Sequence, residues 1–181
     1  MNKDVESVLI SEEELKEICK NLGEQITRDY EGKNLLVVSV LKGSVVFLAD
    51  LLREIKCHCQ IDFLSVSSYS GTKTTGVVKF KKDLDIDPDG MDILIVEDIL
   101  DSGITLSYLS SVLVGRNASS IKICTLLDKP ANRKADIKAD YVGKVIPDAF
   151  VIGYGLDYDE KYRNLPYIGI LKPAVYEQKG E

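Results

Sequence analysis

Hydrophobic residues along the chain fall into short apolar runs that alternate with amphipathic stretches. Ser11 and Glu14 form a capping-box pattern at the start of the first such stretch. The apolar positions that follow keep helical spacing: Leu15, Ile18, Cys19, Leu22 and Ile26. This pattern predicts a helix over 11–30, and similar periodicity predicts helices over 43–55 and 102–115.

The apolar runs between these helices have the length of strands. Strands are predicted over 35–44 (ending in a loop), 61–69, 77–87, 92–97, 121–129 and 167–173, with two shorter ones around a Pro-Asp turn in 141–158. Strands that alternate with helices indicate right-handed crossovers, so we expect an α/β fold with a mainly parallel central sheet flanked by helices. At 181 residues, a single domain over 1–181 is the simplest organisation.

Four polar loops follow predicted strands, at 41–44, 68–76, 97–105 and 128–130. Ligands of parallel α/β sheets bind at the carboxyl ends of the strands. We therefore expect these four loops to contribute to one shared site.

The stretch from Asp92 to Leu106 carries the most chemistry. A buried strand delivers Glu97 and Asp98 to the sheet edge, and the small, hydroxyl-rich segment 101–105 then opens a helix. Free backbone N–H groups and the helix dipole converge at a helix N-terminus, which makes it an anion site. Carboxylates that can bind hydroxyls or a cation thus lie beside a phosphate-binding turn. This combination suits a sugar phosphate.

Composition narrows the class of protein. Hydrophobic residues make up 45% and charged residues 29% of the chain, which is normal for a globular domain. A net charge of −6 argues against broad nucleic-acid binding. No apolar run reaches membrane-spanning length, and the acidic N-terminus does not resemble a signal peptide, so we expect a cytoplasmic protein.

The cysteines and the single histidine offer little catalytic chemistry. Cys57, His58 and Cys59 are adjacent, but no second pair follows at zinc-site spacing, which favours reduced thiols over a zinc centre. His58 lies far in sequence from the acidic loop, so a Ser-His-Asp or Cys-His arrangement is not indicated.

At this point five blocks of sequence resemble those of a known family. Segment 97–105 (EDILDSGIT) resembles the phosphoribosyl pyrophosphate (PRPP) signature of type I phosphoribosyltransferases. Segments 41–44 (LKGS), 68–69 (SY), 127–130 (LDKP) and 147–158 (PDAFVIGYGLDY) follow the order seen in hypoxanthine(-guanine) phosphoribosyltransferases, and 162–166 (YRNLP) extends the match. The resemblance covers nearly the whole chain, with 176–181 left as a tail.

The resemblance implies the type I phosphoribosyltransferase fold with a small hood lobe formed by terminal segments. It implies transfer of a phosphoribosyl group from PRPP to hypoxanthine, with guanine as an open second base and with Mg²⁺ required. It also implies a homodimer or homotetramer. The substrates would be PRPP and a 6-oxopurine base, with no nucleic-acid or membrane partner.

By the same resemblance, the acidic loop binds the sugar phosphate. Glu97 and Asp98 would hold the ribose hydroxyls and, with Asp157, contact the metal. Asp101 would act as general base or proton partner at purine N7. The residues expected to bind the 5′-phosphate are Asp101, Ser102, Gly103, Ile104, Thr105 and Leu106.

The remaining assignments concern the base, the pyrophosphate and a mobile loop. Lys129 would donate to the purine 6-oxo group, while Phe150 stacks on the ring and Val151 and Asp157 read its edge. The residues expected at the pyrophosphate are Lys42, Gly43 and Arg163, and Ser68 and Tyr69 would belong to a loop that closes over the reaction. The Leu41–Lys42 peptide can be cis in this family.

Other interpretations remain open from the residues alone. A regulator that binds PRPP and nucleic acid is a second class, although the chain is acidic, and an enzyme for xanthine or adenine is a third. Each residue also has a plainer alternative: Glu97 and Asp98 as solvated acids, Asp101 as an N-cap, Lys129 as a surface lysine, Phe150 as a core aromatic and Arg163 as a helix-end charge.

Overall fold

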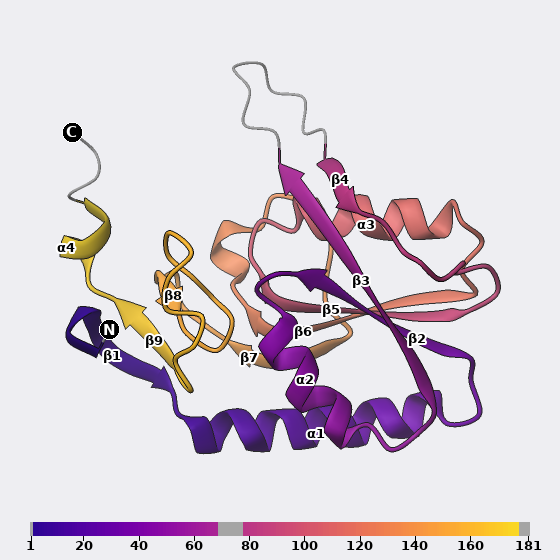
Figure 1. Cartoon of the computed structure of the whole chain (residues 1–181), viewed down its shortest axis with the longest axis horizontal. Coiled ribbons are helices and arrows are strands. Elements are labelled where there is room, and N and C mark those ends of the chain that lie inside the picture. Colours follow the sequence, from indigo (N-terminus) through magenta and orange to yellow (C-terminus); the bar gives the residue numbers. More distant parts are fainter. Residues whose placement is uncertain (1, 69–77, 178–181) are drawn as a thin grey trace.

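A six-stranded sheet with helices on both faces forms the centre of the computed structural model, which describes residues 2–68 and 78–177 (Figure 1). The strand order is β4-β3-β2-β5-β6-β7, and every neighbouring pair is parallel except β3 and β4. The predicted α/β class and the mainly parallel sheet are confirmed. The strands are β2 (Leu35–Leu41), β3 (Cys59–Ser68), β4 (Val78–Lys82), β5 (Asp92–Leu100), β6 (Ser120–Asp128) and β7 (Tyr141–Val145).

The two faces of the sheet bury different helices. In β2, Leu35 and Val37 belong to the apolar cluster under α1 (Glu12–Tyr30) and α2 (Val45–Glu54). Leu36 and Val38 belong to the cluster under α3 (Ile104–Val114). Successive side chains of a strand point to opposite faces, so continuous apolar runs are what a sheet covered on both sides requires.

Helix α1 begins where the capping pattern predicted. Oγ of Ser11 accepts a hydrogen bond from the backbone N–H of Glu14 at 3.2 Å, which satisfies one of the free donors of the first turn. Leu15, Leu22 and Ile26 are buried against the sheet. None of the helices in residues 2–68 and 78–177 is long and apolar enough to cross a membrane.

Strand β5 is longer than the predicted 92–97. Its pairing with β6 continues from Glu97, opposite Thr125, to Leu100, opposite Asp128. The ladder hydrogen bonds extend the strand through two acidic positions that local pattern placed at its end. Glu97 and Asp98 therefore lie within the strand, and their positions are fixed by the sheet.

Strand β4 is shorter than the predicted 77–87. The carboxylate of Asp62 accepts hydrogen bonds from the backbone N–H groups of Asp85 at 2.7 Å and Ile86 at 2.9 Å. These donors are therefore satisfied by a side chain rather than by a strand partner. The chain turns away from the sheet after Lys82 as a result.

The two ends of the chain build a second, small sheet. Strands β1 (Val5–Ile10), β9 (Ile168–Leu171) and β8 (Val151–Ile152) pair antiparallel in the order β1-β9-β8. This hood lies beside the central sheet, at the left of Figure 1. The hood of terminal segments is as expected, although β1 itself was not predicted. Three short helical turns complete the fold: η1 (Asn2–Asp4), η2 (Pro130–Asn132) and α4 (Pro173–Tyr176).

Candidate active site

A cleft of about 300 Å³ opens where β2 and β5 end and α3 begins. It brings together the predicted ribose acids and most of the predicted phosphate turn. Its lining consists of Val40, Leu41, Val66, Glu97, Asp98, Ile99, Asp101, Ser102, Gly103, Thr105 and Leu106.

The two acids of β5 form a coupled carboxyl pair. Asp98 is only 8% exposed, and Oδ1 accepts the backbone N–H of Ile99 at 2.8 Å. Burial, together with the neighbouring Asp98 charge, raises the pKa of Glu97 well above its ordinary value, and burial also raises the pKa of Asp98. Asp98 is buried, so the plainer view of it as a solvated acid is wrong, whereas Glu97 is half-buried.

The pair suits a hard divalent cation. Mg²⁺ prefers oxygen ligands and is usually held by one or two carboxylates together with substrate oxygens. Glu97 and Asp98 supply such a pair, and a cation beside them would favour the ionised form of both carboxyls, which burial disfavours. Within residues 2–68 and 78–177 no group of three or more metal-binding side chains occurs, so the two carboxyls fit Mg²⁺ only as a partial ligand set.

The turn after β5 has the backbone geometry of an anion cradle. Gly103 adopts φ +78°, a conformation that favours glycine, and it caps α3 without a side-chain hydrogen bond. The first N–H groups of the helix therefore lack intrahelical partners, apart from a 3.4 Å contact of the Ile104 N–H with Oγ of Ser102. Asp101 stands two residues before this cap, so the alternative of Asp101 as the N-cap is wrong.

Asp101 lies at the mouth of the cleft with its carboxylate only partly engaged. One oxygen, Oδ2, is 3.7 Å from Nζ of Lys129. The other, Oδ1, is buried and has no hydrogen-bond partner among the described residues. Buried polar atoms are normally satisfied, so the protein holds this carboxylate incompletely, while the Asp101 side chain as a whole is 42% exposed.

Lys129 is a buried lysine, which excludes the plainer view of it as a surface residue. It is 9% exposed, and Nζ lies 3.0 Å from Oδ1 of Asp148 and 3.5 Å from the carbonyl oxygen of Ala149. A buried ammonium needs such partners. The structure thus brings Lys129 and Asp101 together from the ends of two adjacent strands.

Phe150 is not a core residue. Its side chain is 40% exposed, its ring stacks on Tyr176 at 5.2 Å, and the edge of Tyr158 meets it at 5.5 Å. Tyr176 belongs to α4, so part of the segment expected to be a tail is packed in the hood. Val151 follows in β8, an edge strand of the hood sheet, with one edge not paired to another strand.

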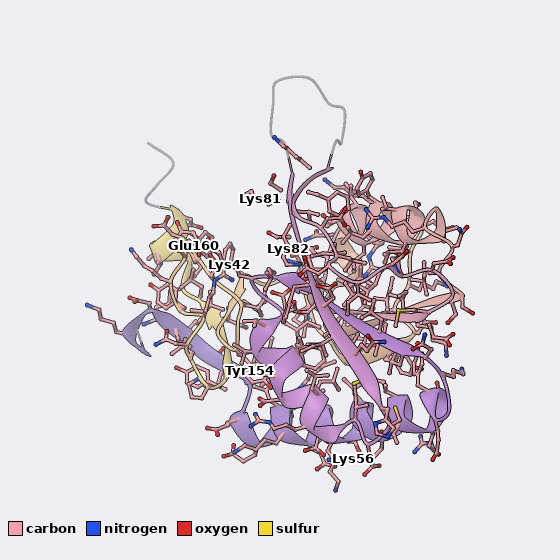
Figure 2. All side chains as sticks on the ribbon, turned by 45° about the vertical axis from the view of Figure 1, so that its right-hand side comes forward. Lys42, Lys56, Lys81, Lys82, Tyr154 and Glu160 are labelled. Atoms are coloured by element: carbon pink, nitrogen blue, oxygen red, sulfur yellow. The ribbon has the colours of Figure 1, made fainter. Side chains whose placement is uncertain are left out.

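Lys42 and Arg163 both contact the carboxylate of Glu160. Oε2 of Glu160 lies 3.0 Å from Nζ of Lys42 and 3.5 Å from Nη2 of Arg163. Figure 2 shows Lys42 and Glu160 side by side, between the hood and the start of α2. The Leu41–Lys42 peptide is cis. Two of the residues predicted to bind pyrophosphate thus share one acidic partner, and their role at pyrophosphate stays a prediction.

Arg163 also anchors the loop on which Asp157 lies. Its Nη1 donates to the carbonyl of Gly155 at 2.7 Å, and its Nη2 lies 2.9 Å from Oδ1 of Asp157. Arg163 lies outside any helix, so a helix-end charge is not its role. Oδ2 of Asp157 accepts the backbone N–H of Glu160 at 2.9 Å. Its assignment as a metal contact stays a prediction.

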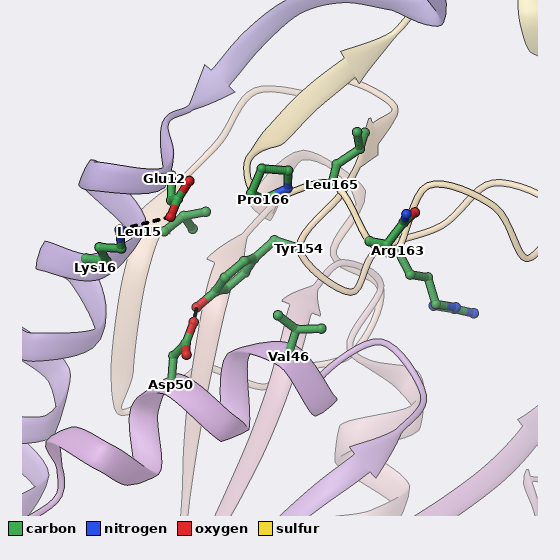
Figure 3. Close-up of a pocket in the computed structure, with 10 residues that line it drawn as sticks. Glu12, Leu15, Lys16, Val46, Asp50, Tyr154, Arg163, Leu165 and Pro166 are labelled. Carbon is green, nitrogen blue, oxygen red and sulfur yellow. Dashed lines mark hydrogen bonds and ion pairs between the residues drawn. The ribbon is translucent and has the colours of Figure 1, made fainter. Parts of the chain in front are cut away.

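A hydrogen bond fixes this hood loop to the central domain. Oη of Tyr154 donates to Oδ2 of Asp50 on α2 at 2.5 Å, and Figure 3 shows the ring pointing at that carboxylate. The pair borders a cavity of about 260 Å³, from which the Arg163 side chain extends away. Helix α2 follows the Lys42 loop, so Tyr154 ties the predicted base-binding loop to the predicted pyrophosphate loop.

The predicted mobile loop is described only at its first residue. Ser68 ends β3, where its backbone is paired with that of Val78. Tyr69 lies outside the described residues.

Several residues near the site were not found by sequence reasoning. Asp148 pairs with Lys129, Glu160 joins Lys42 to Arg163, and Arg133 contacts the turn of Asp101. Arg133 and Glu160 lie in polar segments without periodicity or a motif. Asp148 lies in segment 147–158, which contributed to the family resemblance, but no role was assigned to it there.

Cleft, turn and sheet together define the class. The chain matches the phosphoribosyl transferase domain over residues 8–159 and belongs to that family. Within the family it is similar to the hypoxanthine-guanine phosphoribosyltransferase of Bacillus subtilis, with 58% identity over 98% of this chain and 99% of that protein. It is also 55% identical to the enzyme of that name from Staphylococcus aureus strain Mu50, over 97% of this chain and 99% of the other.

A solved structure agrees with this placement. The crystal structure of a hypoxanthine phosphoribosyltransferase from Staphylococcus aureus superimposes with a TM-score of 0.94 at 55% identity, covering 97% of this chain and 96% of that one. The fold expected from the resemblance is thereby confirmed.

Proposed function

We propose that this protein transfers the 5-phosphoribosyl group of PRPP to N9 of hypoxanthine, and of guanine, giving IMP or GMP and pyrophosphate. The observation that carries the proposal is one cleft in which a buried carboxyl pair lies next to a turn with free N–H groups. The relatives at 55–58% identity over nearly the whole chain support the same activity.

The carboxyls suit the sugar chemistry. Departure of pyrophosphate from C1 leaves positive charge on the ribose ring. Negative groups held in place near that charge stabilise it without reorganisation. Glu97 and Asp98 bind the ribose hydroxyls, and the turn from Asp101 to Leu106 binds the 5′-phosphate. Asp101 holds or accepts the proton at purine N7 through its carboxylate, which is 42% exposed and only partly engaged within the protein.

The base is selected by a buried cation. Lys129 donates to the 6-oxo oxygen, and Phe150 stacks on the ring while the edge of Val151 faces N1. Adenine presents an amino group there, which offers the Lys129 ammonium no acceptor from the base. A site built to hydrogen-bond one group rejects an analogue lacking it by about 10⁴-fold or more.

Pyrophosphate and metal occupy the other half of the site. Lys42, Gly43 and Arg163 hold the pyrophosphate, and the loop from Ser68 and Tyr69 closes over the reaction. Mg²⁺, held by Glu97 and Asp98 with a contact to Asp157, would neutralise the charge of the departing pyrophosphate. The protein acts in the cytoplasm, in line with its four free thiols. It acts there as a homodimer or homotetramer.

Steady-state kinetics with hypoxanthine, guanine, xanthine and adenine at fixed PRPP and Mg²⁺ test the proposal. Hypoxanthine and guanine should support pyrophosphate release, and adenine should not. Binding of PRPP without base-dependent release would indicate a regulator instead. Pyrophosphate release that depends on adenine or xanthine would indicate a related enzyme with a different base specificity.

A further inference from the structure

The segment after β6 packs against the outer side of the turn that holds Asp101. Arg133 lies in it, directly after η2, with its side chain 18% exposed. Nε of Arg133 donates to the carbonyl oxygen of Asp101 at 2.8 Å, and Nη2 donates to that of Leu100 at 3.1 Å. One guanidinium thus holds two successive carbonyls at the end of β5.

Arg133 is itself held rigidly. Nη2 pairs with the carboxylate of Asp128, and Nη1 donates to the carbonyl of Ile137 at 2.8 Å. An added Cβ on Gly103 would lie 3.1 Å from Cδ of Arg133 and 2.6 Å from Ile137, so the turn and this segment are in close contact. The planar, five-donor guanidinium suits such a fixed set of acceptors, whereas an ammonium does not.

The next carbonyl of the turn is held from the same side. The backbone N–H groups of Lys134 and Ala135 both donate to the carbonyl oxygen of Ser102, at 2.9 Å and 3.1 Å. Three consecutive carbonyls, those of residues 100–102, therefore face the segment 133–135.

Because the peptide group is planar, fixing the direction of a carbonyl also fixes the direction of the N–H group of the next residue. In a trans peptide the C=O of one residue and the N–H of the next point in opposite directions. Fixing the carbonyls of Asp101 and Ser102 therefore directs the N–H groups of Ser102 and Gly103 away from Arg133. Both residues line the cleft, and neither N–H has an acceptor within the described residues.

We propose that Arg133 is a positioning residue for phosphate binding, which orients the N–H groups of the turn by gripping the carbonyls behind them. It touches no substrate. The inference rests on the proposed function, in which this turn binds the 5′-phosphate. Cradle N–H groups fixed before binding lose less conformational freedom when the phosphate arrives.

Inhibition by IMP and by inosine isolates the phosphate. The two ligands differ only in the 5′-phosphate. The inhibition constant of inosine divided by that of IMP therefore measures how strongly the cradle binds the phosphate. Arg133→Met keeps the stem and removes every donor, and it should lower this ratio about tenfold or more, as expected for lost hydrogen bonds to an anion. The ratio for Arg133→Lys should fall between that of the wild-type protein and that of Arg133→Met. KM for PRPP should rise by the same factor, while KM for hypoxanthine changes less than about twofold.

Arg116 provides the matched control. Its guanidinium forms a bidentate pair with Asp83, at 2.7 Å for both contacts, away from the cleft. Arg116→Met should lose stability and leave the ratio unchanged. If Arg133→Met does not fold, Asp128→Asn, which weakens one of the four contacts of Arg133, should lower the ratio about threefold.

A folded Arg133→Met variant with the wild-type ratio overturns the inference. An equal loss of IMP and inosine binding also overturns it, because a general lesion would then be the cause. A wild-type protein that does not prefer IMP over inosine refutes the proposed function instead.

Discussion

A Cβ atom added to Gly43 would lie 1.7 Å from Oδ2 of Asp98. Gly43 lies in the loop between β2 and α2 and Asp98 lies in β5, and the carboxylate of Asp98 occupies the space that any side chain at position 43 would need. On the other side, a Cβ on Gly155 would lie 2.0 Å from the carbonyl oxygen of Gly43. Gly43 is therefore confined between Asp98 and the hood, and it does not adopt a positive φ, so glycine is required there for space alone.

Gly43→Ala should therefore reduce kcat/KM for PRPP by about 100-fold or more, which corresponds to about 3 kcal/mol. The added methyl must displace either Asp98 or the backbone that carries Lys42. Gly115→Ala is the control, because its Cβ would meet only ordinary contacts, 3.4 Å and beyond. Wild-type kinetics in Gly43→Ala would show that the site tolerates a side chain in the space between position 43 and Asp98.

Replacement of Asp101 separates proton transfer from phosphate binding. Asp101→Asn should lower kcat by about 10²–10⁴-fold, the usual contribution of a general base. IMP affinity should change only a few-fold, since the cradle consists of backbone groups. Asp148→Asn, which alters the other carboxylate facing Lys129, should leave most of kcat. A parallel loss of IMP binding and turnover in Asp101→Asn would argue against the catalytic assignment.

Removal of the buried ammonium should relax base selection. Lys129→Met keeps the apolar stem but deletes the donor to the 6-oxo group. The ratio of kcat/KM for hypoxanthine to that for adenine should fall by about tenfold or more. Lys144→Met, which breaks an ion pair with Glu14 of α1, controls for loss of a cation. Unchanged selectivity in Lys129→Met would refute the recognition role.

The Glu97–Asp98 pair should cost stability at neutral pH. Its pKa values are raised, so the folded state resists ionisation that the unfolded chain undergoes freely above about pH 4. Stability contributed by the protonated pair is present below that pH and is lost as pH rises through the raised pKa values. Glu97→Gln should raise Tm at pH 7 by about 3–6 °C without added divalent cations, and this gain should vanish near pH 4.

Asp62 supplies a control of opposite sign for that titration. Burial alone would raise the pKa of Asp62, but the N–H groups of Ile86, Phe63 and Asp85 outweigh it and lower the pKa. Asp62→Asn should therefore lower Tm at pH 7, with the loss shrinking as pH falls below about 4. If Glu97→Gln and Asp62→Asn shifted Tm in the same direction at every pH, the pair would not be strained.

Glu160 should compete with pyrophosphate. Its carboxylate lies between Lys42 and Arg163, and the hydrogen bond from Lys42 lowers the pKa of Glu160. Glu160→Gln should lower KM for PRPP by about two- to fivefold at low salt, and the effect should shrink as ionic strength rises, as for any exposed ion pair. Glu12→Gln, which breaks the exposed pair with Lys16, should leave KM unchanged. An increase in KM in Glu160→Gln would mean that Glu160 orders the loop rather than competes.

The sequence by itself determined the alternation of strands and helices, the two-sided sheet and the order of the acidic strand, the turn and the helix. These features depend on neighbours within a few residues, and periodicity and capping record them directly. It also identified Glu97, Asp98 and Asp101 as a group, because one strand and its following turn carry all three.

Only the tertiary structure decided which groups support that turn and how their charges behave. Lys129 is buried because Asp148 and Asp101 approach it from other segments, and Arg133 reaches the carbonyls of β5 from more than 30 positions away. Two strands end elsewhere than predicted for the same reason. Pairing with β6 extends β5 to Leu100, and hydrogen bonds to Asp62 end β4 at Lys82. Contacts between distant segments depend on how the chain packs, which no local pattern encodes.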